Sequence, residues 1–384
     1  MKYGNFGKLD WKVSALGFGS MRLPVTDENP LGPNINEDEA IRMIRHSIDS
    51  GVNYVDTAYG YHAGKSEVVV GKALLDGYRE KVKLATKFPV WLMEKDEDFD
   101  RILDEQLTRL QTDHIDVYML HALNSHTWRD VVLKFDLLKK SEAALRDGRI
   151  RHLGFSFHDS FEVFEEILNG YDKWEFCQIQ YNYMDTENQA GTKGLKLAAE
   201  KGLAVIVMEP LLGGKLADPP ESVLSVLKAH KVHRNPADWA LQWLWNQPEV
   251  SVVLSGMSNM AQVEENIRSA EASGVNSLDE SDLAVIDGMR QKYLEKTAVP
   301  CTGCSYCMPC PEGVNIPGLF NIYNDAFIHD NVANARGVFS WFISEGGRPD
   351  KCIACRICEE RCPQQIKISE LMPKVKDLLM DEKG

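Results

Sequence analysis

The sequence predicts a closed (β/α)₈ barrel, that is a TIM barrel, followed by a small α-helical domain built around clustered cysteines. Three observations predict this fold class. Short apolar runs alternate with helical patterns up to about residue 275. Most neighbouring runs start about 25 to 36 residues apart, which is the length of one βα unit. Eight of the nine cysteines lie beyond residue 300. We therefore expect the barrel over residues 1–298 and the second domain over residues 299–384.

Each expected strand is rich in apolar and β-branched residues, and a pattern with a period near 3.6 follows it. The strands are expected at Val13–Gly19, Asn53–Thr57, Lys83–Phe88, Ile115–His121, Arg151–Phe157, Phe176–Gln180, Leu203–Glu209 and Val250–Leu254. The helices are expected at Glu39–Asp49, Ser66–Tyr78, Phe99–Leu110, Trp128–Leu145, Phe161–Leu168, Lys193–Lys201, Pro236–Trp245 and Met260–Ala270. Strict alternation favours parallel strands, because a crossover helix is what joins parallel neighbours.

An open dinucleotide-binding sheet is the alternative for such an alternating pattern. It is weak here, because Gly17-Phe-Gly19 does not lead into a helix with a third glycine. Eight units in about 270 residues also suit a closed barrel better. A last helical stretch, Asp279–Lys296, leads to Val299-Pro300, where the composition changes, and a helical insert separates the two cysteine clusters beyond it.

The charge balance limits the classes of partner. Asp and Glu number 57 against 43 Lys and Arg, which gives a formal net charge of -14. Such a surface repels phosphate backbones and anionic membranes, which argues against nucleic-acid and membrane roles. The N-terminus carries no apolar signal segment, and no run approaches the roughly 18 apolar residues of a membrane span. We expect a cytoplasmic protein whose clustered thiols bind metal in a reducing compartment.

The second cysteine cluster has the spacing of an iron–sulfur loop. Cys352, Cys355, Cys358 and Cys362 follow the pattern C-x₂-C-x₂-C-x₃-C, and Pro363 comes next. The first cluster differs only in its last gap, which has two residues. In this motif three thiolates bind one cube and the fourth binds the other cube. The ligand sets are expected to be Cys301, Cys304, Cys307 and Cys362 for one [4Fe–4S] cluster, and Cys352, Cys355, Cys358 and Cys310 for the second.

Zinc is the alternative metal, because Cys₄ zinc sites also use C-x₂-C pairs. Zinc would need two pairs per site, and it gains nothing from a third cysteine at the same spacing or from a trailing Cys-Pro. The shortened gap in the first cluster leaves the fourth ligand open. The segment resembles bacterial dicluster ferredoxins. Cys177, at the start of an expected buried strand, is interpreted as an inert core thiol.

Four polar residues stand at or just past the C-terminal ends of the expected second, third and fourth strands. They are Asp56, Tyr61, Lys87 and His121. In a (β/α)₈ barrel that face carries the active site. Asp56 and Lys87 are costly to bury unless they are paired, so we expect them to neutralise each other. A neighbouring cation is expected to lower the pKa of Tyr61 enough for general acid or base work, with His121 as the second proton-handling or orienting group.

Each of these residues has a structural alternative when it is taken alone. A histidine at a strand end is more often a satisfied structural residue, and Lys87 could extend its amine to solvent. Tyr59 competes with Tyr61 for the same role. The four residues together, in chain order, favour a catalytic site.

With the phrases Leu16-Gly-Phe-Gly-Ser20, Asp56-Thr-Ala58 and Gly64-Lys-Ser-Glu67, these four residues make the first 275 residues resemble the aldo-keto reductase family. The resemblance includes Gly154-Phe-Ser156, Gln178 and Val263-Glu-Glu-Asn266. The added cysteine clusters are similar to the iron–sulfur subgroup of that family. The resemblance implies that Tyr61 donates a proton to a substrate carbonyl, that Lys87 and Asp56 polarise it, and that His121 orients the oxygen. Hydride would come from a nicotinamide across the barrel mouth.

The resemblance also implies a set of cofactor-binding positions: Gly19, Ser20, Met21, Ser156, His158, Gln178, Met208, Gly213, Lys215, Ser255, Gly256, Gln262 and Asn266. Some depart from the family pattern. Ser156-Phe-His158 stands where the family has a Ser-Asn pair, and Met208 stands where it commonly has an aromatic ring. Gly256 and Gln262 stand where NADPH-specific members carry basic residues. Each charged hydrogen bond to the extra phosphate of NADPH would be worth about 1.5–3 kcal/mol, and Gly256 and Gln262 can make none. The resemblance therefore favours NADH among the NAD(P)H cofactors.

The phosphates of the cofactor have two expected contact regions. Gly213 and Gly214 would let backbone N–H groups approach a phosphate, and Lys215 would pair with it, although an exposed loop lysine is the commoner outcome. The helix that begins near Asn259 offers an anion site at its N-terminus. Asn259 and Gln262 are alternatively a helix-start capping pair.

Three functions follow from these features. A nicotinamide delivers two electrons as hydride, whereas a [4Fe–4S] cluster passes one electron at a time. The intact set of four residues favours an oxidoreductase that reduces a carbonyl, or oxidises the alcohol, with NAD(P)H, the clusters serving electron transfer or support. The second function is a flavin-containing reductase with FMN at the mouth and one-electron input from a redox partner protein. The third is a non-catalytic, redox-sensing subunit.

Overall fold

The computed structural model describes residues 1–384 with the exception of 28, 302–306, 363–364 and 381–384. The chain divides into two compact units. The first unit comprises Met1–Leu216 and Ala237–Glu280, and the second comprises Ala217–Pro236 and Ser281–Gly384. The domain boundary at residue 298 stays a prediction.

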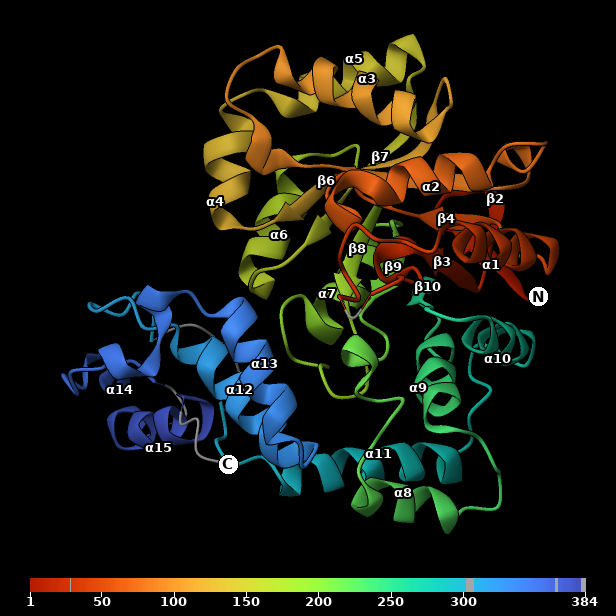
Figure 1. Cartoon of the computed structure of the whole chain (residues 1–384). Helices are drawn as coiled ribbons and strands as arrows, with labels where there is room; N and C mark the ends of the chain where they lie inside the picture. Colours follow the sequence, from red (N-terminus) through yellow and green to blue (C-terminus); the bar gives the residue numbers. More distant parts are fainter. Residues whose placement is uncertain (28, 302–306, 363–364, 381–384) are drawn as a thin grey trace. The chain divides into compact units, whose positions relative to one another are not determined.

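Eight parallel strands of the first unit close into a barrel in the order β10-β3-β4-β5-β6-β7-β8-β9, which confirms the predicted (β/α)₈ architecture (Figure 1). The strands are β3 (Leu16–Gly19), β4 (Tyr54–Asp56), β5 (Lys83–Phe88), β6 (Ile115–Leu123), β7 (Ile150–Phe157), β8 (Phe176–Gln180), β9 (Ala204–Met208) and β10 (Val250–Gly256). The barrel closes where Val253 of β10 pairs with Leu16 of β3. The strands are almost wholly buried, as expected when helices cover the outer face of a parallel sheet.

Helices follow the barrel strands along the chain. They are α1 (Glu37–Asp49), α2 (Lys65–Ala73), α3 (Asp98–Leu110), α4 (Ser125–Thr127), α5 (Leu137–Asp147), α6 (Phe161–Gly170), α7 (Gly191–Glu200), α9 (Pro236–Trp245) and α10 (Met260–Glu271). Short turns are η1 (Ser20–Arg22), η2 (Tyr61–Gly64), η3 (Arg79–Lys81), η4 (Val90–Leu92), η5 (Trp128–Leu133, a π-helix) and η6 (Leu212–Gly214). The helix expected over Trp128–Leu145 is interrupted, because Asp136 takes a left-handed φ of 50° between η5 and α5.

An antiparallel hairpin precedes the barrel, where the sequence predicted only the start of the first strand. It consists of β1 (Tyr3–Phe6) and β2 (Leu9–Ser14). Phe6 and Val13 are fully buried, and they share one apolar cluster with Tyr54, Phe176 and other residues inside the barrel. The expected strand Val13–Gly19 is therefore two strands, and the first belongs to a hairpin that packs on barrel residues.

The second unit is helical in its described part, as predicted. Its elements are α8 (Glu221–Lys228), α11 (Glu280–Glu295), α12 (Ile316–Ile328), α13 (Val332–Phe342), η7 (Glu345–Gly347), η8 (Pro349–Lys351), α14 (Ile357–Glu360) and α15 (Ile368–Met380). Leu319 and Phe320 of α12 and Val375 of α15 lie at the centre of its core. Helices α12 and α13 form the predicted insert between the two cysteine clusters. Among the helices that the structure describes, none has the length and apolar character that a bilayer crossing requires.

Candidate active site and iron–sulfur sites

The four predicted catalytic side chains meet at the C-terminal ends of neighbouring barrel strands. Asp56 ends β4, Lys87 is the second-last residue of β5, and His121 lies near the end of β6. Tyr61 begins η2, just beyond β4. Because β4, β5 and β6 pair in that order, the chain brings these residues to one face of the barrel.

Lys87 and Asp56 form a buried ion pair. Lys87 Nζ lies 2.5 Å from Asp56 Oδ1 and donates to the Thr57 carbonyl at 2.8 Å. The two side chains are 0% and 3% exposed. Burial alone would lower the pKa of Lys87, but the carboxylate of Asp56 and the neighbouring Tyr61 together outweigh burial, so the pKa lies above its ordinary value. The amine is therefore held as an ammonium ion beneath the site.

The same ammonium group lies 4.9 Å from the centre of the Tyr61 ring. We expected this cation to lower the pKa of Tyr61, and that expectation is wrong. Burial raises the pKa of Tyr61 above 10, and the charge of Lys87 offsets only part of the rise because Asp56 opposes it. Tyr61 is thus a protonated phenol over the ordinary pH range, which is the form that can donate a proton.

Tyr59, the competing tyrosine, is directed elsewhere. Its hydroxyl donates to Glu105 Oε2 at 3.0 Å, and the guanidinium of Arg109 lies 4.2 Å from its ring centre. Both partners belong to α3, so the phenol of Tyr59 is engaged on the helical side. Lys87 stands beside Tyr61, which favours Tyr61 over Tyr59 as the acid.

A β-bulge places His121. The pairing of β6 with β7 shifts register between Leu120 and Leu123, and Ala122 takes a left-handed φ of 55°. The Ala122 N–H donates to Ser156 Oγ at 2.7 Å. Bulges of this kind redirect side chains next to active sites. Ser156, which we predicted as a cofactor contact, thus has a second role, because its hydroxyl oxygen holds the bulge that carries His121.

His121 is a neutral imidazole. Its ring lies 6.2 Å from the Tyr61 ring at an interplanar angle of 78°. Burial and the nearby Lys87 charge lower its pKa well below 6.5. His121 Nδ1 is buried and has no hydrogen-bond partner among the described residues. Trp91, which sequence reasoning missed, lies 5.0 Å from the His121 ring and is 51% exposed, so it adds an aromatic surface beside the site.

The predicted cofactor residues on β3, η1 and β10 lie around the same face. A Cβ on Gly19 would lie 3.2 Å from the Ser255 carbonyl, so glycine permits the two strand ends to approach. Ser20 Oγ donates to the Asp56 carbonyl at 2.8 Å, and Met21 is 37% exposed. Ser255 Oγ accepts from Asn266 Nδ2 at 2.9 Å.

Two predicted cofactor residues, one within β8 and one at the end of β9, form a pair. Gln178 Nε2 donates to Met208 Sδ at 3.4 Å. Gln178 is 2% exposed, and its Oε1 is buried with no partner among the described residues. A buried amide oxygen without a donor is costly, and a ligand N–H group at the barrel mouth would satisfy it.

Two glycines beyond β9 leave the backbone accessible. Gly213 and Gly214 take left-handed φ values of 68° and 97°, and a Cβ on Gly214 would meet nothing within 4 Å. Lys215 follows them as the residue after η6. The geometry therefore fits the expectation of a backbone phosphate contact at this loop.

Arg22 is a candidate phosphate-binding residue that sequence reasoning missed. A Cβ on Gly256 would lie 3.4–3.5 Å from three carbons of the Arg22 stem, and a Cβ on Gly213 would lie 3.5 Å from its Nη2. The stem thus crosses Gly256, where family members that prefer NADPH carry a basic residue. The absence of a side chain at Gly256 leaves room for the Arg22 stem, and the guanidinium end of Arg22 lies near Gly213 in the loop after β9.

Gln262 makes helix-capping contacts, and His158 is held through its backbone. The Gln262 N–H donates to Asn259 Oδ1 at 3.0 Å, and Gln262 Oε1 accepts from the Ser258 N–H at 2.8 Å. The structural alternative for this pair, helix capping, is thus present at the start of α10. The His158 backbone N–H donates to the Leu123 carbonyl at 2.9 Å, and the side chain is exposed.

In the second unit, four cysteines line one cavity. They are Cys310, Cys352, Cys355 and Cys358, the four that the crossed pattern assigns to one [4Fe–4S] cluster. Ala354 and Arg356 take left-handed φ values of 53° and 64°, so the chain turns sharply between the cysteines. The rest of the lining includes the apolar Val314, Ile316 and Ile368. This donor set fits an iron–sulfur cube.

The expected ligand set of the other [4Fe–4S] cluster is only partly described. Cys301, Cys307 and Cys362 pack against the same core, whereas Cys304 lies outside the described residues. No three His, Cys, Asp or Glu side chains of the described residues are close enough to hold one metal ion. A cube takes each thiolate on a different iron, so its ligands stand further apart. Cys177, by contrast, is fully buried in β8, and burial raises the pKa of its thiol well above the usual range, as expected for an inert thiol.

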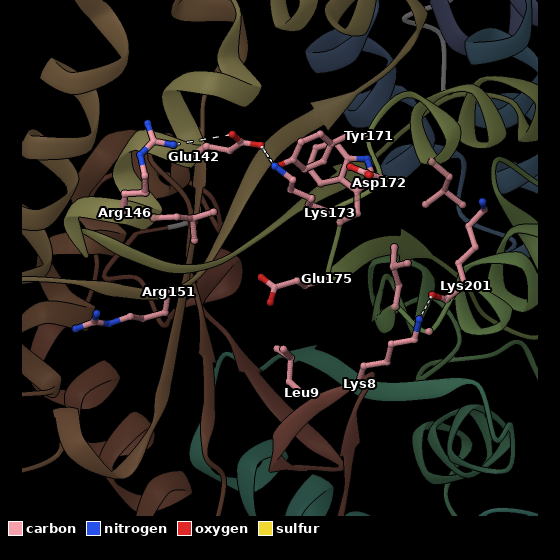
Figure 2. Close-up of a pocket in the computed structure, with 15 residues that line it drawn as sticks. Lys8, Leu9, Glu142, Arg146, Arg151, Tyr171, Asp172, Lys173, Glu175 and Lys201 are labelled. Atoms are coloured by element: carbon pink, nitrogen blue, oxygen red, sulfur yellow. Dashed lines mark hydrogen bonds and ion pairs between the residues drawn. The ribbon is translucent and has the colours of Figure 1, made fainter.

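A further cavity of the first unit lies away from the site (Figure 2). Its lining includes Arg151, Glu175 and Leu203, which lie at or next to the N-terminal ends of β7, β8 and β9. Figure 2 shows Glu142 bonded to Lys173, at 2.8 Å, and Lys8 bonded to the Lys201 carbonyl, at 2.9 Å. Lys173 is thus paired with a carboxylate and Lys8 with a backbone carbonyl, at the barrel face that serves stability.

Comparisons with known proteins give a family for the barrel and a domain type for the cysteine-rich segment. The model of the aldo/keto reductase family matches residues 15–290, and the model of the 4Fe-4S dicluster domain matches residues 300–366. L-galactose dehydrogenase of Arabidopsis thaliana is 27% identical over 302 residues, which cover 74% of this chain and 92% of the relative. NADH-specific methylglyoxal reductase of Escherichia coli is 28% identical over 320 residues, covering 70% and 93%.

A solved structure is similar as well. The holo form of an aldo-keto reductase from Bacillus halodurans superposes with a TM-score of 0.62 at 27% sequence identity, covering 75% of this chain and 96% of that one. The match therefore spans the barrel.

Proposed function

Because the chain belongs to the aldo/keto reductase family and is an oxidoreductase with a 4Fe-4S dicluster domain, we propose that it reduces a carbonyl group, or oxidises the alcohol, at the face that holds Tyr61. The observation that carries the proposal is the buried Lys87–Asp56 pair beside a protonated Tyr61. This pairing turns a strand end into a proton-donating site. A bound NAD(P)H would supply hydride to the carbonyl carbon.

The residues of this chain would then perform the proton chemistry. The Tyr61 hydroxyl donates to the carbonyl oxygen, and the Lys87 ammonium stabilises the phenolate left behind. Lys87 keeps its charge because Asp56 accepts from it at 2.5 Å. His121, being neutral, can donate one ring N–H to the same oxygen without competing as an acid.

The cofactor positions support a nicotinamide dinucleotide. The unpartnered Gln178 oxygen would accept a hydrogen bond from the nicotinamide carboxamide. Ser255 and Asn266, which bond to each other, would border another part of the dinucleotide. Gly213 and Gly214 would approach a phosphate by their backbones, with Arg22 nearby. NADH remains our favoured cofactor, since Gly256 offers no charge and Gln262 is used in capping.

The iron–sulfur clusters would supply one-electron chemistry. Cys310, Cys352, Cys355 and Cys358 would hold one cube, and Cys301, Cys304, Cys307 and Cys362 the other. A flavin at the mouth with one-electron input from a redox partner protein is a second candidate function. Met208 favours it, because it stands where the family commonly stacks an aromatic ring on the nicotinamide.

The test uses protein purified without oxygen and assayed with a panel of carbonyl compounds, with NADH, NADPH or FMN plus a one-electron donor. Tyr61→Phe should lower carbonyl reduction about 10²–10⁴-fold, the usual cost of a lost general acid. Tyr59→Phe is the matched control and should keep most of the rate, because its hydroxyl bonds to Glu105. Equal rates for Tyr61→Phe and wild type would overturn the proposal. Turnover with FMN but with neither nicotinamide would favour the second candidate.

A further inference from the structure

The residues directly after Tyr61 have an unusual backbone. His62, Ala63 and Gly64 take consecutive left-handed φ values of 51°, 54° and 86°. Glycine adopts this conformation freely, but His62 and Ala63 do so at a cost in conformational energy. Such a run persists only where the surrounding structure fixes it. The position of Tyr61, at the start of η2, therefore depends on what holds the residue next to it.

The side chain of His62 supplies the fixation. It is 2% exposed, and both ring nitrogens are bonded to backbone. His62 Nε2 accepts from the Leu23 N–H at 3.2 Å, and Nδ1 lies 2.7 Å from the Gly32 carbonyl. Because the first nitrogen accepts, the ring is neutral and Nδ1–H is the donor to Gly32. Burial also lowers the pKa of His62, which agrees with a neutral ring.

The two bonds connect the Tyr61 turn to the segment between β3, the neighbour of β4, and α1. Leu23 follows η1, whose Ser20 donates to the Asp56 carbonyl at 2.8 Å. Ser66, at the start of α2, donates in turn to Ser20 Oγ at 2.8 Å. His62 thus adds to a set of hydrogen bonds that joins η2 to the residue after η1, and η1 to the end of β4 and to the start of α2.

We propose that His62 is a positioning residue: its two backbone hydrogen bonds lock the left-handed turn after Tyr61 and so set the phenol relative to Lys87 and the end of η1. The inference rests on the proposed function of Tyr61. His62 is not part of the proton path, because its ring faces Leu23 and Gly32. A misplacement of about 1 Å in a reacting group can cost roughly 100-fold in rate.

Three substitutions separate the backbone effect from the hydrogen bonds. His62→Gly removes both bonds but suits the left-handed backbone, His62→Ala removes the bonds and keeps the backbone cost, and His62→Asn suits the backbone and keeps an N–H donor for Gly32. Carbonyl-reduction kcat should fall about 10- to 100-fold in His62→Gly and His62→Ala, with KM for the carbonyl little changed. His62→Asn should recover part of the loss. His152→Ala is the matched control, since it removes a histidine of β7 that is bonded to Glu175.

A double-mutant cycle with Tyr61→Phe decides whether His62 acts through the phenol. In a Tyr61→Phe background, His62→Gly should lower the residual rate less than twofold, because the group that it positions is gone. An equal fall in both backgrounds would overturn the inference, and so would a His62→Gly enzyme with full kcat. Retained activity in Tyr61→Phe alone would instead overturn the proposed function, so the two failures are distinguishable. Thermal unfolding of each variant, measured alongside, identifies a loss of rate that comes from unfolding.

Discussion

Ser156 Oγ accepts the backbone N–H of Ala122 at 2.7 Å, and this bond holds the β-bulge that places His121 at the barrel mouth. Ser156 is 1% exposed, so no water competes for the bond. One hydroxyl group on β7 thus determines the position of an imidazole on β6, in addition to its expected contact with the cofactor.

Ser156→Ala tests this relationship. The Ala122 N–H would lose its partner, which costs about 1–3 kcal/mol of folding free energy for a buried donor. We expect kcat for carbonyl reduction to fall about 10- to 100-fold as His121 moves. Steady-state kinetics and denaturant unfolding check both effects. The control is Ser141→Ala, which removes a buried hydroxyl in α5 with no partner among the described residues; it should leave kcat unchanged and should not lower stability. Full activity in Ser156→Ala would show that the bulge holds without it.

The pH profile should be flat where free histidine and tyrosine would titrate. The pKa of His121 is depressed, so it stays neutral as the pH falls through 6.5, and the pKa of Tyr61 is raised, so it stays protonated up to at least about 10. The same pKa shift makes folding stability depend on pH. As the pH falls, His121 is protonated in the unfolded chain before it is protonated in the folded one. The contribution of neutral His121 to stability is therefore complete above about 6.5 and is lost as the pH falls toward the lower, folded pKa. Measuring the rates of wild type and His121→Gln from about pH 5.5 to about pH 10 checks the predicted flat profile, because this range includes the ordinary pKa values of histidine and tyrosine. A rate limb centred near 6.5 that disappears in His121→Gln would contradict the assignment.

Arg22→Ala should weaken dinucleotide binding. A charged contact to phosphate is worth about 1.5–3 kcal/mol, which corresponds to roughly a 10- to 150-fold higher Kd. Because the guanidinium lies near Gly213, we expect NADH and NADPH to weaken alike. Fluorescence titration of both cofactors measures this. Arg42→Ala removes an exposed arginine of α1 that pairs with Glu39, and it should change neither Kd. A loss confined to NADPH would instead place the contact at its extra phosphate.

Iron content tests the crossed ligand sets. Two cubes predict about eight irons per chain in protein prepared without oxygen. Cys310→Ser should leave about four, because it removes a ligand from the cavity that Cys352, Cys355 and Cys358 line. Cys177→Ser, in the barrel core, is the control and should keep all of the iron. Zinc in place of iron would contradict the cluster assignment, and so would full iron in Cys310→Ser.

The strands could be predicted because their signals are local. The apolar runs Lys83–Phe88 and Phe176–Gln180 match β5 and β8 at both ends, and the spacing of the cysteines needs no knowledge of tertiary structure. Asp56, Tyr61, Lys87 and His121 could be chosen because a barrel brings the C-terminal ends of its strands together.

Other features depend on contacts between distant parts of the chain. Arg22 becomes a candidate only when Gly213 and Gly256 are seen beside it, and nothing in its own neighbourhood indicates this. The bulge at Ala122 depends on Ser156 of the next strand. The predicted direction of the Tyr61 pKa shift was also wrong, because the sequence shows the nearby cation but not how completely the site is removed from water.

Cys310 precedes α12, whereas the other three thiols of its cavity follow α13. A cube bound there would cross-link the residues before α12 to those after α13. Oxidative loss of one cube would therefore remove a structural cross-link as well as a redox centre. Oxygen damage to this protein would then register as local unfolding of the tail, and proteases would cut the damaged chain between the cysteine clusters while the barrel persisted.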